Sequence, residues 1–291
     1  MIDSLDIRTL SVAMSIIGLI LCFCMLYVYA TRKTYAGFMQ WTTASVLISI
    51  AMGLVGSRNL LPDFFSIVVA NLLIVSGNSF VSYGLERFTG QRPNKWLFIS
   101  QSAAAIVLIP CFTYYIPSVD ARIVILSAIL AVLFGYSGYI VFKHVPVLVK
   151  NRNSLLVTSL SILSAWNILR MILTAQGAPI PDLMTASTFH GATLMVFICG
   201  YITVIIGLII LNFQKVELDL SAAIDEVRTL RGIVPICTSC KKIKDEKGSW
   251  SLVEEYVRAH SHAEFSHGMC PDCMKKFYPD YVDEENDEQI T

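Results

Sequence analysis

Seven apolar stretches constrain this chain most, because each is close to the roughly 20 residues that a helix needs to cross a bilayer. They are predicted at 9–30, 36–56, 64–84, 96–116, 122–142, 154–175 and 184–212. A backbone inside hydrocarbon must satisfy its own hydrogen bonds, and short connections favour a compact serpentine arrangement. We therefore expect an all-α polytopic membrane protein, with a seven-helix transmembrane bundle over residues 1–212.

Composition divides the chain at the same place. Residues 1–212 carry 12 Lys and Arg against 6 Asp and Glu, whereas residues 213–291 carry 10 against 16. The zero net charge thus hides a basic membrane part and an acidic remainder, and this balance argues against a nucleic-acid partner. The N-terminus is acidic and the first apolar run is a full span long, so we expect that run to be retained and not cleaved as a signal peptide.

The positions of Lys and Arg predict the orientation. Eight such residues lie in the predicted connections after the first, third and fifth spans, and three lie on the opposite side, namely Arg8, Arg58 and Arg122. Positively charged loops tend to remain in the cytoplasm. We predict a multi-pass protein of the bacterial inner (cytoplasmic) membrane, with the N-terminus outside and the C-terminus in the cytoplasm.

Two C-x-x-C pairs stand out in the acidic remainder, separated by 29 residues. The four cysteines are Cys237, Cys240, Cys270 and Cys273. Each pair can direct two thiolates at one ion, and two pairs complete the tetrahedral S4 shell of structural zinc. Pro271 and Asp272 predict that the second pair opens a helix, and 251–260 has the pattern of another. We expect a small α+β module of zinc-knuckle or treble-clef-like form at 233–281.

Other readings of these cysteines remain open. They could be a redox-sensitive dithiol, an iron site or unbound thiols, and His267 could replace one metal ligand. Attachment of a c-type haem needs C-x-x-C-H, whereas Lys241 and Met274 follow the two pairs. No thioredoxin-like βαβ pattern surrounds either pair, which favours structural zinc as the cofactor.

Two parts of the sequence resemble bacterial signalling proteins. The runs GIVPICTSCKKIKDEKGSW and VEEYVRAHSHAEFSHGMCPDCMKKFYPD resemble a short cysteine module found at the C-termini of such proteins. The seven spans, and the run ANLLIVSGNSFVSYGLERFTG, resemble the seven-span sensory domains that precede diguanylate cyclases or histidine kinases. These resemblances imply a signalling context, but the chain has no cyclase signature, no kinase domain and no nucleophile elbow, so we expect no enzyme activity.

Polar residues inside the predicted spans suggest a site, because they are costly in a membrane. The candidate pocket residues are Asn71, Asn78, Asn167, Arg170 and His190. They either hydrogen-bond between helices or line a ligand pocket, in which Arg170 pairs with an anionic group and His190 is a donor or a pH-sensitive charge. A haem on His190 would lack a partner histidine, since His144 is predicted at the opposite side.

The segment 213–232 is expected to be a helical coiled-coil connector. Its apolar residues follow a spacing of four and three, as in Val216, Leu220, Ala223, Val227 and Leu230. This pattern predicts a homodimer through 213–231, or else an amphipathic helix lying along the module or the membrane. The acidic residues 282–291 are expected to be a disordered tail.

Together these features predict a non-catalytic sensor or adaptor. The bundle would detect a small or membrane-soluble signal, and the connector would present a zinc-bound module to a cytoplasmic signalling protein. The alternatives are a thiol-based redox sensor that uses the C-x-x-C pairs, and a transporter or channel component. No short or Pro-broken spans recur in two halves, as inverted transporter repeats would require.

Overall fold

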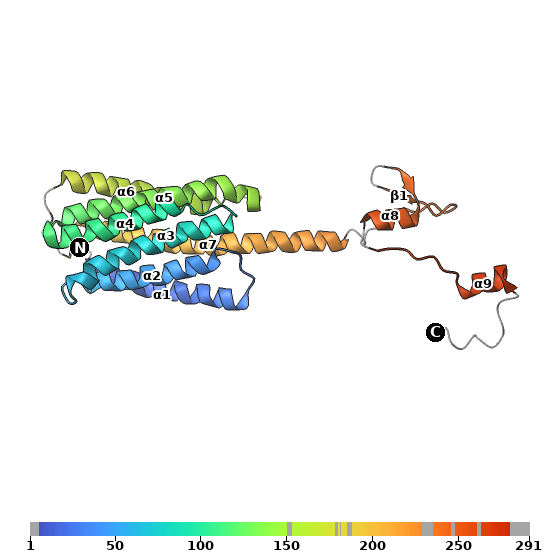
Figure 1. Ribbon diagram of the computed structural model, residues 1–291, viewed down its shortest axis with the longest axis horizontal. Helices are drawn as coiled ribbons and strands as arrows, with labels where there is room; N and C mark the ends of the chain where they lie inside the picture. The colour runs from blue at the N-terminus through green and yellow to red at the C-terminus, as the bar shows by residue number, and fades with distance from the viewer. Residues whose placement is uncertain are drawn as a thin grey trace. The chain divides into compact units, whose positions relative to one another are not determined.

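The computed structural model describes residues 6–149, 153–177, 180, 182–184, 188–228, 235–245, 248–260 and 263–279 (Figure 1). The chain divides into two compact units, one ending at Asp219 and the other beginning at Leu220. Each unit is described by itself below.

The first unit consists of long helices. They are α1 (Ile7–Thr31), α2 (Phe38–Gly56), α3 (Ala70–Phe88), α4 (Lys95–Pro110), α5 (Val119–Val149), α6 (Ser154–Gln176) and α7 (Thr188–Arg228). Two π-helical segments extend this set, η1 (Phe64–Val69) before α3 and η2 (Cys111–Tyr115) after α4. Within the described residues, seven helices are long and apolar enough to cross a membrane, so the predicted seven spans are confirmed.

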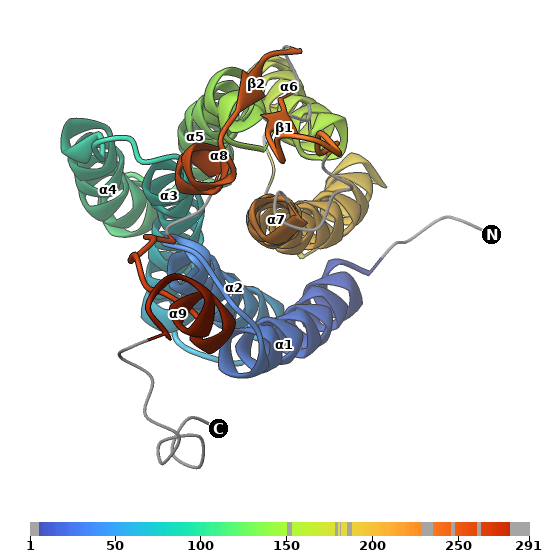
Figure 2. The same cartoon turned by 90° about the vertical axis from the view of Figure 1, so that its right-hand side faces the viewer.

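The helices run alternately up and down, so the bundle has two ends. We call them the Ile7 end, where α1 begins, and the Arg32 end, where α1 has finished. A view along the helices shows α1, α2, α3, α5 and α6 in an arc, with α4 outside it next to α3 and α7 in its opening (Figure 2). The larger apolar core cluster draws on α1, α2, α3, α5, α6 and α7, and a smaller one packs α4 against η1, α3 and α5.

Hydroxyl groups supply the hydrogen bonds between helices. Ser82 of α3 bonds Ser137 of α5 at 2.7 Å, and Ser45 of α2 bonds Tyr201 of α7 at 2.6 Å. Ser164 of α6 donates to the carbonyl of residue 131 in α5 at 2.9 Å. Small hydroxyl-bearing side chains of this kind join membrane helices without requiring a buried charge.

Two leucines of α6 pack directly against glycines of α7. A Cβ atom on Gly200 would lie 2.5 Å from the side chain of Leu163, and one on Gly207 would lie 3.1 Å from Leu156. The two contacts are seven residues apart on each helix, so the same interdigitation is repeated along the pair. Small residues at such contacts allow membrane helices to approach closely.

The start of α2 depends on another close approach. Gly37 precedes α2 with a φ of +103°, a conformation that favours glycine, and an added Cβ would collide with the carbonyl oxygen of Gly84 in α3. Gly84 in turn faces the indole ring of Trp41, which is fully buried. The α1–α2 connection is therefore held tightly against α3 at the Arg32 end.

The second unit contains the predicted α+β elements. Strands β1 (Ile243–Lys244) and β2 (Trp250–Ser251) pair antiparallel, and α8 (Val253–His260) and α9 (Pro271–Phe277) follow. The two helices lie where the sequence pattern placed them. The side chains of Val227 and Leu230 lie outside the described residues, as does the tail 282–291, so the coiled-coil seam and the disordered tail stay predictions.

Candidate functional site

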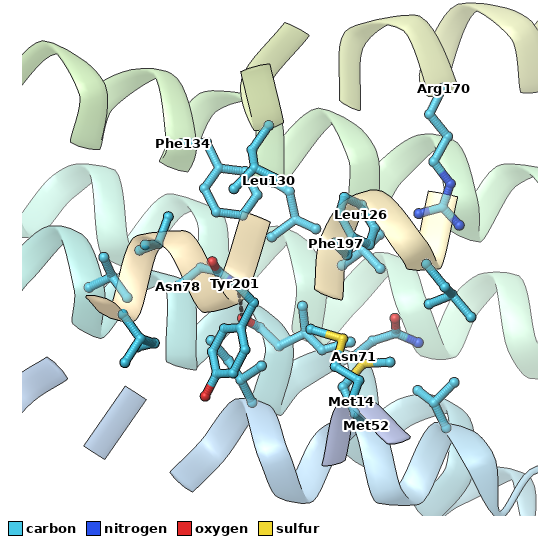
Figure 3. A pocket seen from close by; sticks show the side chains of 18 of the residues that line it. Met14, Met52, Asn71, Asn78, Leu126, Leu130, Phe134, Arg170, Phe197 and Tyr201 are labelled. Carbon is cyan, nitrogen blue, oxygen red and sulfur yellow. Dashed lines mark hydrogen bonds between the residues drawn. The ribbon is translucent and has the colours of Figure 1, made fainter. Parts of the chain in front are cut away.

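A hollow of about 970 Å³, including the part open to solvent, lies among six helices of the bundle (Figure 3). Three of the predicted pocket residues line it, namely Asn71, Asn78 and Arg170. Most of the lining is apolar and comes from α1, α2, α3, α5, α6 and α7; it includes Met14, Met52, Leu130, Phe134, Phe197 and Val204. A largely apolar lining with a few polar groups is typical of small-molecule sites.

Two buried arginines face this hollow from the Ile7 end. Arg170 of α6 is 8% exposed, and Arg58 after α2 is 7% exposed. The Nε atom of each is buried without a hydrogen-bond partner among the described residues. Figure 3 shows the guanidinium of Arg170 pointing from its helix into the space between the helices. The guanidinium of Arg170 lies over the ring of Phe197, whose centre is 5.7 Å away.

A smaller hollow of about 320 Å³ adjoins the first at the Ile7 end and is also lined by Arg122 of α5. Arg58, Asn71 and Arg170 line both hollows and so mark their junction. Burial lowers the pKa of Arg58 to about 10, and repulsion by Arg122 adds to this, against attraction by Asp182 and Asp63. Arg58 therefore remains charged near neutral pH despite its burial.

The three asparagines do not join helices through their amide nitrogens. Asn71, Asn78 and Asn167 each donate to the carbonyl four residues earlier in their own helix, at 2.7, 2.9 and 2.8 Å. Asn71 and Asn78 can therefore present their amide oxygens to the hollow that they line. The expectation that the polar residues bridge helices is met by serines and Tyr201, not by these side chains.

Two of the predicted pocket residues are not among those that line the hollow. Asn167 is fully buried in α6, and its amide oxygen has no partner. His190 is buried near the start of α7, in edge contact with Phe189 at 5.5 Å, and its Nδ1 has no partner. Spacing along the helices did not determine which way each of these side chains turns.

Sequence reasoning also missed lining residues. Arg58 was counted only as a loop cation, although the chain after α2 turns it inward, and Tyr201 was not considered. The tyrosine hydroxyl bonds Ser45, while its ring faces the hollow (Figure 3). A charge directly after a span is the one signal that could have drawn attention to Arg58.

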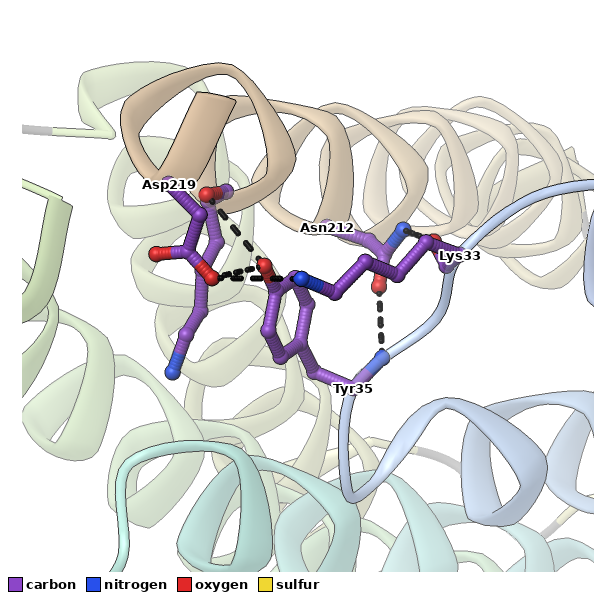
Figure 4. Close-up of polar contacts among 5 residues, drawn as sticks. Lys33, Tyr35, Asn212 and Asp219 are labelled. Atoms are coloured by element: carbon purple, nitrogen blue, oxygen red, sulfur yellow. Dashed lines mark hydrogen bonds and ion pairs between the residues drawn. The ribbon is translucent and has the colours of Figure 1, made fainter. Parts of the chain in front are cut away.

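At the Arg32 end, α7 is fastened to the α1–α2 connection by paired polar groups (Figure 4). Asn212, fully buried, accepts from the backbone N–H of Tyr35 at 3.1 Å and donates to the carbonyl of Lys33 at 3.2 Å. Two helical turns after Asn212, Asp219 accepts a hydrogen bond from the Tyr35 hydroxyl and forms an ion pair with Lys33 at 3.6 Å. Lys215 lies over the Tyr35 ring, 4.6 Å from its centre.

These contacts explain why the first unit ends at Asp219 and not at residue 212. We call Lys33, Tyr35, Asn212, Lys215 and Asp219 the α7 clasp. Burial raises the pKa of Tyr35 to about 12, and its hydrogen bond to Asp219 adds to the shift. The phenol is therefore protonated, and able to donate, across the physiological range.

A second buried polar group lies at the same end. Glu86 of α3 is 1% exposed and accepts from the Tyr136 hydroxyl at 2.6 Å and from the backbone N–H of Asn94 at 2.9 Å. It joins α3, α5 and the start of α4. This role was not predicted, because Glu86 stands next to Arg87 in what was predicted as a charged connection.

The first cysteine pair lies in a tight turn between two short extended segments. Ile236 pairs with Ile243, and the N–H of Cys237 donates to the carbonyl of Lys242 at 2.8 Å. Backbone N–H groups of Cys240 and Ser239 donate to the Cys237 sulfur and lower its pKa. Lys241, with a φ of +59°, completes the turn. Amides directed at a sulfur are the arrangement expected of a thiolate ligand.

The second pair opens α9, as predicted. Cys270 is the residue before the helix, Pro271 begins it, and N–H groups of Cys273 and Asp272 donate to the Cys270 sulfur and lower its pKa. Each pair thus fits half of an S4 metal site. Among the described residues, however, no group of three or more His, Cys, Asp or Glu side chains is close enough to hold a metal, so the four-cysteine zinc site stays a prediction.

The seven long apolar helices define a multi-pass membrane protein. Comparison with known proteins gives no match to a family model, to a curated protein or to a solved structure. The function must therefore be argued from the site itself.

Proposed function

We propose that this protein is a non-catalytic sensor or adaptor of the bacterial inner membrane. The bundle binds a signal molecule in the hollow beside Arg58 and Arg170, and α7 transmits the change to the cysteine module. The module, closed by zinc on Cys237, Cys240, Cys270 and Cys273, then binds a cytoplasmic signalling protein. Dimerisation through 213–231 is part of this proposal.

The observation that carries the proposal is the path of α7. Leu194, Phe197 and Tyr201 of this helix line the hollow, and the same helix continues past Asp219 to Arg228 without a break. A ligand that contacts α7 therefore has a direct mechanical connection to the segment that leads to the cysteines. A ligand shifts such an equilibrium only by its differential contacts with the two states, and α7 provides those contacts.

The residues present suit a structural zinc ion. Four thiolates would fill its coordination shell and leave no position for water, so zinc would supply folding energy and no Lewis-acid chemistry. The two cysteine turns already direct backbone amides at Cys237 and Cys270. A zinc ion bound by both cysteine pairs would connect the first turn to the start of α9.

The proposal is tested with the full chain in detergent, by elemental analysis beside a variant with Cys270→Ser and Cys273→Ser. We expect one zinc per chain in the wild type and none in the variant. Proximity labelling in cells should then identify a cytoplasmic neighbour that the variant loses while its membrane insertion is unchanged. Metal-free protein in which the four module cysteines react as free thiols would favour the redox-sensor alternative, and an unchanged set of neighbours would refute the adaptor role.

A further inference from the structure

The two joined hollows differ in chemistry along their length. The smaller one, at the Ile7 end, brings together Arg58, Arg122 and Arg170, with Asn71 beside them. The larger one continues from Arg58 and Arg170 into the middle of the bundle, where its lining is formed mainly by Leu, Ile, Val, Met and Phe side chains. A molecule that fits both must be charged at one end and apolar over the rest.

The length of the apolar part can be estimated from the helices that line it. It extends along α3 from Asn71 to Val81 and along α7 from Leu194 to Ile205. At about 1.5 Å per helical residue, each of these stretches measures about 15 Å. Figure 3 shows Asn71 and Arg170 toward one side of this space and Asn78 and Phe134 toward the other. The space is thus elongated along the bundle.

Three arginines meet at the Ile7 end, and Asp182 and Asp63 attract two of them, Arg58 and Arg122. Arg58 and Arg170 are more than nine-tenths buried, and each has an Nε atom with no partner. A buried cation without a partner is expensive, and an anionic group placed between the two guanidinium groups would accept their free hydrogens. A neutral lipid would leave that cost in place, and a small inorganic anion would leave the apolar space unfilled.

We propose that the bundle binds an amphiphilic anion, a single acyl chain with a carboxylate or phosphate head. The head lies between Arg58 and Arg170 next to Asn71, and the chain extends between Phe134, Phe197 and Tyr201. This inference rests on the proposed function, since it names the class of signal that the bundle detects. Because acyl chains partition into the bilayer, such a ligand can enter the bundle from the membrane and needs no aqueous channel.

The test uses the full chain in phosphatidylcholine nanodiscs and a lauric acid analogue that carries a diazirine in its chain. After irradiation, mass spectrometry should place the label on the α5 and α7 peptides that contain Phe134, Phe197 and Tyr201. Excess lauric acid or lysophosphatidic acid should abolish this labelling, and competition by one but not the other would identify the head group. The methyl ester of the probe should label these peptides about ten- to a hundredfold less, as loss of charged hydrogen bonds predicts.

Variants identify the head-group site. Arg58→Met or Arg170→Met should reduce labelling at least tenfold, and Arg170→Lys should keep more of it than Arg170→Met. Arg92→Ala, which removes an exposed cation at the Arg32 end, is the matched control and should label as the wild type does. Each variant is first checked for a single elution volume and cooperative thermal unfolding.

Several results would overturn the inference. These are equal labelling by the acid and its ester, labelling unaffected by both Arg58→Met and Arg170→Met, and competition by inorganic phosphate alone. Label confined to outward-facing residues such as Phe142 and Ile162, which are 62% and 60% exposed, would also overturn it. Photolabelling of the bundle does not depend on what the cysteine module binds. Specific binding of an acyl anion by a protein with no zinc and no partner would therefore refute only the proposed function. Zinc and a partner without acyl binding would refute only the ligand class.

Discussion

At the Arg32 end of the bundle, Asn212 exchanges hydrogen bonds with Lys33 and Tyr35, whereas at the Ile7 end Arg58 and Arg170 keep buried nitrogens without partners. The polar groups of the α7 clasp bond one another within the chain, and these bonds stabilise the position of α7. The two arginines each keep a buried Nε atom without a partner. Under our proposal, one end of the bundle is therefore built for stability and the other for binding.

The largest effect should come from Gly37→Ala, which attacks the Arg32 end. The new Cβ would meet the carbonyl oxygen of Gly84 and would strain a residue at φ +103°. We expect a loss of about 3 kcal/mol in unfolding free energy, measured by thermal unfolding in detergent. Gly90→Ala is the control, because Gly90 also has a positive φ, +71°, but has nothing within 4 Å of its Cβ position. It should cost about 1 kcal/mol. Equal losses would show that the close approach to α3 is unimportant.

Asn212→Ala should destabilise the bundle by about 2 kcal/mol, since it removes two hydrogen bonds and leaves the N–H of Tyr35 and the carbonyl of Lys33 unpaired. Thr203→Val serves as the control, because the Thr203 hydroxyl bonds only the carbonyl of Cys199 in its own helix. Denaturation midpoints in mixed micelles give the comparison. Equal denaturation midpoints for the two variants would show that the clasp does not stabilise α7.

Arg170→Met should raise the free energy of unfolding, in contrast to the two variants above. Because Arg170 is buried and unpaired, replacing it with an apolar side chain of similar length should raise the stability of the delipidated protein by about 1 kcal/mol or more, while abolishing binding of the acyl anion. Thermal unfolding with and without lauric acid measures both effects. A destabilised variant would mean that Arg170 has a structural role, and the contrast between the two ends would fail.

The smallest effect is expected from Tyr35→Phe, and it should depend on pH. The pKa of Tyr35 is raised from 10.0 to about 12 in the folded protein, so its contribution is complete below pH 10 and is lost as pH rises through about 12. At pH 8 the variant should be less stable by about 1 kcal/mol, and the difference should vanish above pH 12. A constant difference across this range would mean that the hydroxyl does not donate to Asp219.

The sequence predicted the helices far better than the site. Apolar length alone located all seven spans and placed five of them to within four residues at each end, because the requirement for about 20 apolar residues is strict. The helices α5 and α7 continue well beyond the predicted ends at 142 and 212. Of the predicted pocket residues, Asn71, Asn78 and Arg170 line the hollow, but helical spacing cannot tell whether Asn167 or Arg170 turns toward it. Arg58 and Tyr35 lie in connections, where no periodicity constrains the direction of a side chain, and their partners are distant in sequence.

The cysteine module shows the same limit in another form. Spacing predicted the two turns and the start of α9, both of which are local. The proposed meeting of the two pairs is not local, since 29 residues separate them, and it would depend on an ion that no sequence pattern contains. A site completed by an external ion can be proposed from its halves, but only metal analysis can show that they meet.

The repeated contact between α6 and α7 sets the kind of movement that a ligand can produce. Leu156 and Leu163 fit against Gly207 and Gly200, and both fits would be lost together if α7 slid along α6 by part of a turn. The two helices therefore pack in a defined register, and α7 can occupy only discrete axial positions relative to α6. Rotation or tilt of α7 about these two contacts keeps the register. Under the proposed function, α7 would occupy a few defined positions. The output of each molecule should then change in steps, while the fraction of switched molecules rises with the signal concentration.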